Sequence, residues 1–205
     1  MNIKILNYKI HIDFSFVFFV TILFFIDKSF FIISALVASL IHELGHLVAI
    51  KKNSSTSEQL DIDFSIFKLN IVDSHRLSKS FREDLTILIS GPAFNFVVFF
   101  LFLLLSTILK NDRLHFFALE NLFLFIFNLL PIAPLDGGQI LFAILSFKFD
   151  FLIAQKIVSI ISLSLIYIIS SFGFFIFLYS KYNISVLLLS IYIVFFLYKK
   201  TDFYF

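Results

Sequence analysis

Apolar residues are concentrated in long, nearly uninterrupted runs, separated by short polar segments. A helix that crosses a bilayer needs about 20 mostly apolar residues. Six stretches approach that length: residues 14–26 (extended back to Ile10), 30–50, 85–109, 114–130, 157–179 and 184–198. This pattern predicts an all-α polytopic membrane protein with about six transmembrane helices, forming a single domain over residues 1–205.

The distribution of basic residues predicts the orientation of these helices. With six spans, both termini lie on one side of the membrane, and that side and its loops carry twelve of the sixteen Lys and Arg residues. Cytoplasmic loops are enriched in Lys and Arg, so both termini are expected in the cytoplasm. The first span is expected to remain as an uncleaved anchor, because no A-x-A cleavage site follows it.

One loop shows a different periodicity. Between residues 58 and 73, apolar residues alternate with polar ones, first at Leu60, Ile62, Phe64 and Ile66, and then in the other phase at Phe67, Leu69 and Ile71. Period-two alternation predicts strands, and the change of phase predicts a bulge or tight turn. We therefore expect a small β-element in the cytoplasmic loop after the second helix; the alternative is a small amphipathic hairpin on the membrane surface.

Composition narrows the function classes. Hydrophobic residues make up 60% of the chain and charged residues only 15%, whereas a soluble domain has about 25% charged residues. This excludes an ordinary soluble enzyme and a disordered protein. The net charge of +2 gives no phosphate-binding surface, so no nucleic acid is expected as a partner. The chain has no cysteine, so any metal site must use His, Asp or Glu.

The second predicted helix carries the motif His42-Glu43-x-x-His46 near its end. Residues i and i+4 project from one face of a helix, so the two imidazoles can bind one zinc ion. Glu43 can then act on a metal-bound water as general base. The alternative, two histidines and a glutamate packed at a helix end, has to place a carboxylate in a membrane span at a cost of about 2.5 kcal/mol or more.

A third ligand is expected from the segment that follows the fourth predicted helix. There, Asp136 ends an apolar run rich in proline, and the adjacent glycines Gly137 and Gly138 let the backbone approach a buried site closely. Asp136 is therefore the best candidate, which leaves the fourth zinc position to water. Alternatively, this segment is a turn at the membrane surface with Asp136 solvated.

These motifs resemble those of the site-2 protease family (M50) of intramembrane zinc metalloproteases. The matching residues are His42-Glu43-x-x-His46, Gly91-Pro92-x-x-Asn95, and Asn128-x-x-Pro131-x-x-Pro134-x-Asp136-Gly137. The six-span plan is most similar to the compact stage IV sporulation protein FB group, although the C-terminal nucleotide-binding domain common in that group is not expected here. The resemblance implies a membrane-spanning protein substrate, such as a membrane-bound regulatory protein, a possible membrane regulator, and a bacterial cytoplasmic membrane as the location.

The resemblance also implies a mechanism. One Zn²⁺ per chain is held by His42, His46 and Asp136, and Glu43 is the catalytic residue. Asn128 either donates a hydrogen bond to the substrate backbone or orients Asp136; Pro134 and Gly137 belong to the same substrate-binding or supporting segment. The β-element is expected to pair with extended substrate.

Other parts of the pattern are interpreted more simply. Asn95 is a buried amide that needs hydrogen-bond partners; the resemblance places it in the packing around the site, not among the catalytic groups. Two other functions stay open: a catalytically inactive family member acting as a membrane scaffold, and a metal transporter. The nearly apolar outer halves of the helices disfavour the transporter.

Overall fold

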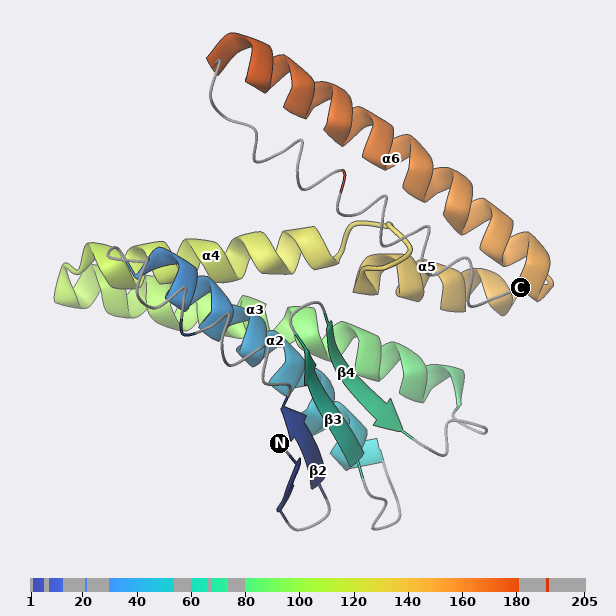
Figure 1. Ribbon diagram of the computed structural model, residues 1–205, viewed down its shortest axis with the longest axis horizontal. Helices are drawn as coiled ribbons and strands as arrows, with labels where there is room; N and C mark the ends of the chain where they lie inside the picture. The colour runs from blue at the N-terminus through green and yellow to red at the C-terminus, as the bar shows by residue number, and fades with distance from the viewer. Residues whose placement is uncertain are drawn as a thin grey trace. The chain divides into compact units, whose positions relative to one another are not determined.

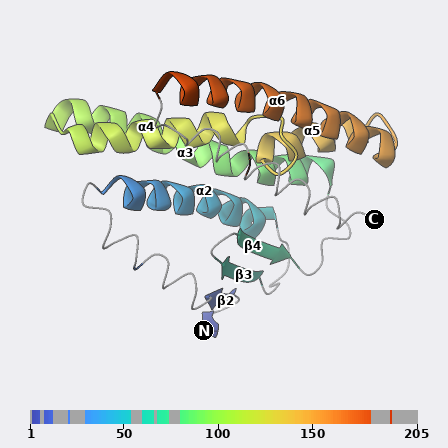
Figure 2. The ribbon, with the colours of Figure 1, turned by 45° about the horizontal axis from the view of Figure 1, so that its top comes forward.

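The computed structural model describes residues 2–5, 8–12, 21, 30–53, 60–65, 68–73, 80–180 and 191. The chain divides into two compact units, Met1–Ile126 and Phe127–Phe205. Figures 1 and 2 show the helices and strands in two views.

The described residues of the first unit form three helices. They are α2 (Phe31–Asn53), α3 (Phe81–Leu109) and α4 (Asp112–Asn128), whose last residues cross into the second unit. Helix α3 begins after Ser80, whose backbone N–H donates to Glu83 Oε2 at 3.3 Å. It ends at Lys110, which adopts the left-handed conformation that commonly terminates helices.

Helices α2 and α3 approach each other closely because Gly45 lies between them. A Cβ atom on Gly45 would lie 2.6 Å from the Ser90 carbonyl oxygen and 3.0 Å from the Cα of Gly91. A side chain there would therefore push the two backbones apart. This close approach places the histidine-bearing turns of α2 against the middle of α3.

The first unit also contains a four-stranded sheet in the order β1-β2-β3-β4. Its strands are Asn2–Ile5, Tyr8–Ile12, Leu60–Ser65 and Lys68–Asp73. β3 and β4 pair antiparallel, with Ile62 opposite Ile71, and they occupy the segment whose alternating pattern predicts strands. β2 joins β3 in parallel, with Ile10 opposite Ile62.

The sheet corrects two expectations. Strands were expected only in the loop after the second helix, but the N-terminal residues supply two of the four strands. The first predicted span does not extend back to Ile10, because Tyr8–Ile12 is a strand. The physical reason is the alternation of apolar and polar residues in Tyr8-Lys9-Ile10-His11-Ile12, which suits a strand rather than a membrane helix.

The second unit contains α5 (Asp136–Ser146) and α6 (Phe151–Ser180). Helix α5 lies between the predicted spans 114–130 and 157–179, where no helix was predicted. The turn before it packs on α6: the fully buried Ile132 contacts Ile166, and the Ala133 N–H donates to Ser162 Oγ at 2.9 Å. Ser162 in turn donates to the Val158 carbonyl at 2.7 Å.

Among the described residues, three helices are long and apolar enough to cross a membrane: Phe31–Lys52, Phe81–Leu109 and Phe151–Tyr179. The fourth predicted span coincides with α4, which has 17 residues. The spans predicted at residues 14–26 and 184–198 lie outside the described residues, apart from Thr21 and Ile191, so the number six stays a prediction.

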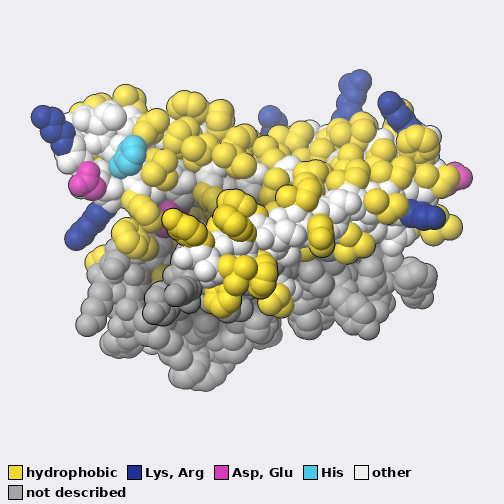
Figure 3. Space-filling model, turned by 90° about the horizontal axis from the view of Figure 1, so that it is seen from above, with side chains coloured by type: hydrophobic (Ala, Val, Ile, Leu, Met, Phe, Trp, Pro, Cys, Tyr) yellow, Lys and Arg dark blue, Asp and Glu magenta, His cyan; other side chains and the backbone are white. Residues whose placement is uncertain are grey.

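Large hydrophobic side chains cover most of the described surface in Figure 3. Val97 on α3 is 64% exposed and Leu152 on α6 is 76% exposed. Such a surface is unfavourable in water and suits contact with lipid.

Ser162→Ala removes the acceptor of the Ala133 N–H, and we expect it to destabilise the protein by about 1 kcal/mol. Ser164→Ala is the matched control, because Ser164 is exposed and its hydroxyl donates only within α6, to the Ile160 carbonyl. Unfolding midpoints in detergent measure both variants. Equal midpoints for the two would contradict the role given to Ser162.

Candidate metal centre

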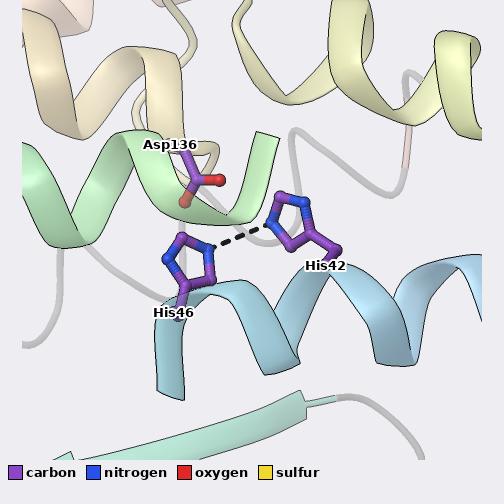
Figure 4. Close-up of side chains that lie close together, drawn as sticks. All are labelled: His42, His46 and Asp136. Carbon is purple, nitrogen blue, oxygen red and sulfur yellow. Dashed lines mark hydrogen bonds between the residues drawn. The ribbon is translucent and has the colours of Figure 1, made fainter. Parts of the chain in front are cut away.

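Two buried histidines on successive turns of α2 form the centre of the candidate site. The Nε2 atoms of His42 and His46 lie 3.1 Å apart, with the rings nearly perpendicular (Figure 4). Both residues are buried. The helix thus directs the same nitrogen of each ring to one point, as the i, i+4 spacing predicts.

The other nitrogen of His42 is held by an amide on α3. His42 Nδ1 lies 2.8 Å from Asn95 Oδ1, while Asn95 Nδ2 donates to the Ala38 carbonyl at 3.0 Å and to Asn121 Oδ1 at 2.9 Å. Those two acceptors fix the orientation of the Asn95 amide, so its Oδ1 faces the histidine. An amide oxygen can only accept, and His42 Nδ1 must therefore be the donor.

The other nitrogen of His46 is held by the backbone of α3. His46 Nδ1 lies 2.7 Å from the Ile87 carbonyl oxygen, which can only accept. The ring also fits against Gly91, where a Cβ atom would lie 2.3 Å from His46 Nε2. Gly91 therefore provides the space that the imidazole occupies.

These contacts make the pair suitable for a metal ion. When Nδ1 carries the proton in both neutral rings, both Nε2 atoms present lone pairs, and two lone pairs 3.1 Å apart repel each other unless a cation is shared between them. Two nitrogens bound to one tetrahedral zinc ion lie about 3.3 Å apart. The donor set and its spacing therefore fit zinc.

Glu43 follows His42 on α2 and is half-buried. It is therefore the acidic residue adjacent in the chain to the first histidine of the pair. A carboxylate beside a metal site can act in proton transfer.

Asp136 belongs to the second unit, where it is the buried first residue of α5 (Figure 4). Two glycines fix its backbone. A Cβ on Gly137 would lie 2.2 Å from the Leu129 carbonyl oxygen, and one on Gly138 would lie 2.2 Å from that of Ile132. Any larger residue would displace the start of α5, so both glycines are needed to keep Asp136 where it is.

The other residues predicted for this segment lie in or next to the turn before α5. Asn128 is the last residue of α4, and Pro134 lies in the turn before α5; both are half-buried. For Gly137, the structure gives a packing reason that does not involve a substrate.

Sequence reasoning missed two groups that support the histidines. Asn121 is completely buried on α4; its Nδ2 donates to the Phe117 carbonyl at 2.8 Å, which turns its Oδ1 toward Asn95. The Ile87 carbonyl could not be found, because any residue type supplies one. The signal for Asn121 was available: an amide in an apolar helix must find a partner.

Comparisons with known proteins find a matching family model and a curated relative. The family model for peptidase family M50 matches residues 111–169. The zinc metalloprotease MJ0392 of Methanocaldococcus jannaschii is 34% identical over 165 residues, which cover 78% of this chain. The chain spans 45% of the length of that curated relative.

A solved structure is also similar. The site-2 protease from Methanocaldococcus jannaschii matches with a TM-score of 0.62 and 27% identity, over 95% of this chain and 92% of that one. Together with its apolar helices, this match indicates an integral membrane protein. The sporulation subgroup stays a prediction. The family model and both relatives agree with one another: the chain is similar to peptidases of family M50 and to a site-2 protease.

Proposed function

We propose that this protein is an intramembrane zinc metalloprotease that hydrolyses peptide bonds in or near the transmembrane segments of membrane-bound regulatory proteins. The observation that carries the proposal is the histidine pair, whose Nε2 atoms are directed to one point and whose Nδ1 atoms are both held by acceptors. The names of both relatives support protease chemistry.

In this proposal, His42, His46 and Asp136 hold one zinc ion. The aspartate is the hard oxygen ligand that completes a His₂-carboxylate set, and the glycines after it keep its backbone in place. A zinc ion there would supply Lewis-acid chemistry, acidifying the attacking water and polarising the scissile carbonyl.

Glu43 carries the proton. It takes one from the attacking water as general base and gives it to the leaving amine as general acid. Asn128 either donates to the substrate backbone or orients Asp136, and Pro134 and Gly137 shape the segment that substrate meets.

The substrate must be extended when it reaches the site, because the carbonyls of an intact helix are occupied by hydrogen bonds. β4 lies at one edge of the sheet, where its outer backbone groups are suited to pairing with an extended chain. We infer that substrate is unwound and held in this form on the cytoplasmic side, with both termini of the protease on that side.

Glu43→Gln is expected to abolish cleavage of a membrane-spanning substrate while the purified protein still binds about one zinc ion, since the amide cannot accept the proton. We expect the loss to exceed about 100-fold. Zinc content and cleavage in detergent are measured together, with Glu83→Gln in the first turn of α3 as the matched control.

If the parent binds zinc but cleaves no member of a panel of spans, the inactive scaffold becomes the better hypothesis. If the parent binds no zinc in metal-replete buffer, the proposed site is wrong.

Gly91→Ala is expected to weaken zinc binding, because the new methyl group occupies the space of the His46 ring. Displacing a ligand in this way should lower the affinity about 10- to 100-fold. Competition with a chromophoric chelator measures it, and the lipid-facing Val97→Ala on the same helix serves as control. Parental affinity in Gly91→Ala would show that this close approach does not position the ring.

A further inference from the structure

We propose that Asn95 and Asn121 are positioning residues that fix the tautomer of His42, so that its Nε2 rather than its Nδ1 is presented to the metal. The inference rests on the proposed zinc site but concerns the two amides outside it. Neither amide belongs to the proposed set of zinc ligands, and both are completely buried.

The first step is the burial of both side chains. Asn95 and Asn121 are 0% exposed and lie on different helices, α3 and α4, in segments that are otherwise almost entirely apolar. A buried amide in such surroundings costs free energy unless its groups are hydrogen-bonded. Leucine would fill the same space equally well, so packing alone does not explain why these two positions carry amides.

The second step is the direction of the hydrogen bonds, which runs one way through the three side chains. The Phe117 carbonyl accepts from Asn121 Nδ2, so Asn121 Oδ1 accepts from Asn95 Nδ2. Asn95 Oδ1 then accepts from His42 Nδ1. Because the series begins at a backbone carbonyl, which cannot donate, neither amide can turn over without losing a partner.

Asn95 makes a second contact with α2, the helix that carries His42. Asn95 Nδ2 also donates to the Ala38 carbonyl, one helical turn before His42 on α2. Asn95 thus contacts α2 at two points, the His42 ring and the backbone one turn before it. Asn95 therefore holds the ring at a fixed angle as well as selecting its protonated nitrogen.

His46 reaches the same state by a different route, through the Ile87 carbonyl. A backbone acceptor cannot be changed by a side-chain substitution, whereas the acceptor for His42 is a side chain. The two histidines therefore differ in how they can be tested. Only the tautomer of His42 can be changed by substituting the side chain that accepts from its Nδ1.

The test uses the full-length protein in detergent. Asn95→Leu, of similar volume, should lower zinc affinity about 10- to 100-fold, and Asn121→Leu should lower it less, because the Ala38 carbonyl still orients Asn95. Ser106→Ala is the control: Ser106 is a buried polar residue on the same helix that donates to the Leu103 carbonyl. Its zinc affinity should equal that of the parent.

The second readout separates positioning from general support. With ¹⁵N-labelled histidine, the metal-free parent should show His42 protonated at Nδ1, identified by its loss in His42→Gln. In Asn95→Leu, the same signal should report a mixture of the two tautomers. A purely structural role would lower affinity without changing this signal.

Each outcome decides the matter. Unchanged zinc affinity in a folded Asn95→Leu overturns the inference and leaves the proposed protease intact. Weakened affinity with His42 still protonated at Nδ1, or an equal loss in Ser106→Ala, also overturns it. If Asn95→Leu does not fold, Asn95→Ala carries both measurements under the same criteria, because it also removes the acceptor of His42 Nδ1. A parent that binds no zinc refutes the proposed function instead.

Discussion

The candidate site depends on one constraint: polar groups buried among apolar helices must all be hydrogen-bonded. In this chain the constraint is met by backbone carbonyls at Ala38, Ile87 and Phe117, which together orient two imidazoles and two amides. Because these acceptors are fixed by the helices, the side chains they hold have little freedom. The result is a pair of Nε2 atoms directed to one point before any metal arrives, which reduces the reorganisation that binding requires.

Small residues make this arrangement possible. Gly45 lets α2 and α3 approach, and Gly91 leaves room for the His46 ring. In the second unit, Gly137 and Gly138 let the start of α5 pack against the carbonyls of residues 129–132. The chain has only five glycines, and these four lie beside a predicted ligand or its supporting backbone. Their scarcity elsewhere makes their positions informative about function.

Much of this could be predicted from the sequence. The spacing of His42 and His46 predicted that both imidazoles lie on one face of a helix, and the apolar runs predicted the long helices. The N-terminal strands were not predicted because the short segment Tyr8–Ile12 directly precedes an apolar run, although its residues alternate between polar and apolar. Helix α5 was missed because Pro131 and Pro134 before it, and Gly137 and Gly138 in its first turn, are typical of a connection. The role of Asn95 as a partner of His42 could not be predicted, since it depends on how α3 and α2 pack.

The proposed zinc site of His42, His46 and Asp136 uses nitrogen and oxygen ligands alone. Zinc K-edge X-ray absorption on the purified, zinc-loaded protein tests it directly, with Asp136→Asn and His46→Gln beside the parent. The account predicts two imidazole nitrogens at about 2.0–2.1 Å and oxygen ligands at about 2.0–2.2 Å, with the imidazole signal halved in His46→Gln. An imidazole signal that is unchanged in His46→Gln, or a zinc absorption spectrum that is unchanged in Asp136→Asn, would contradict this assignment.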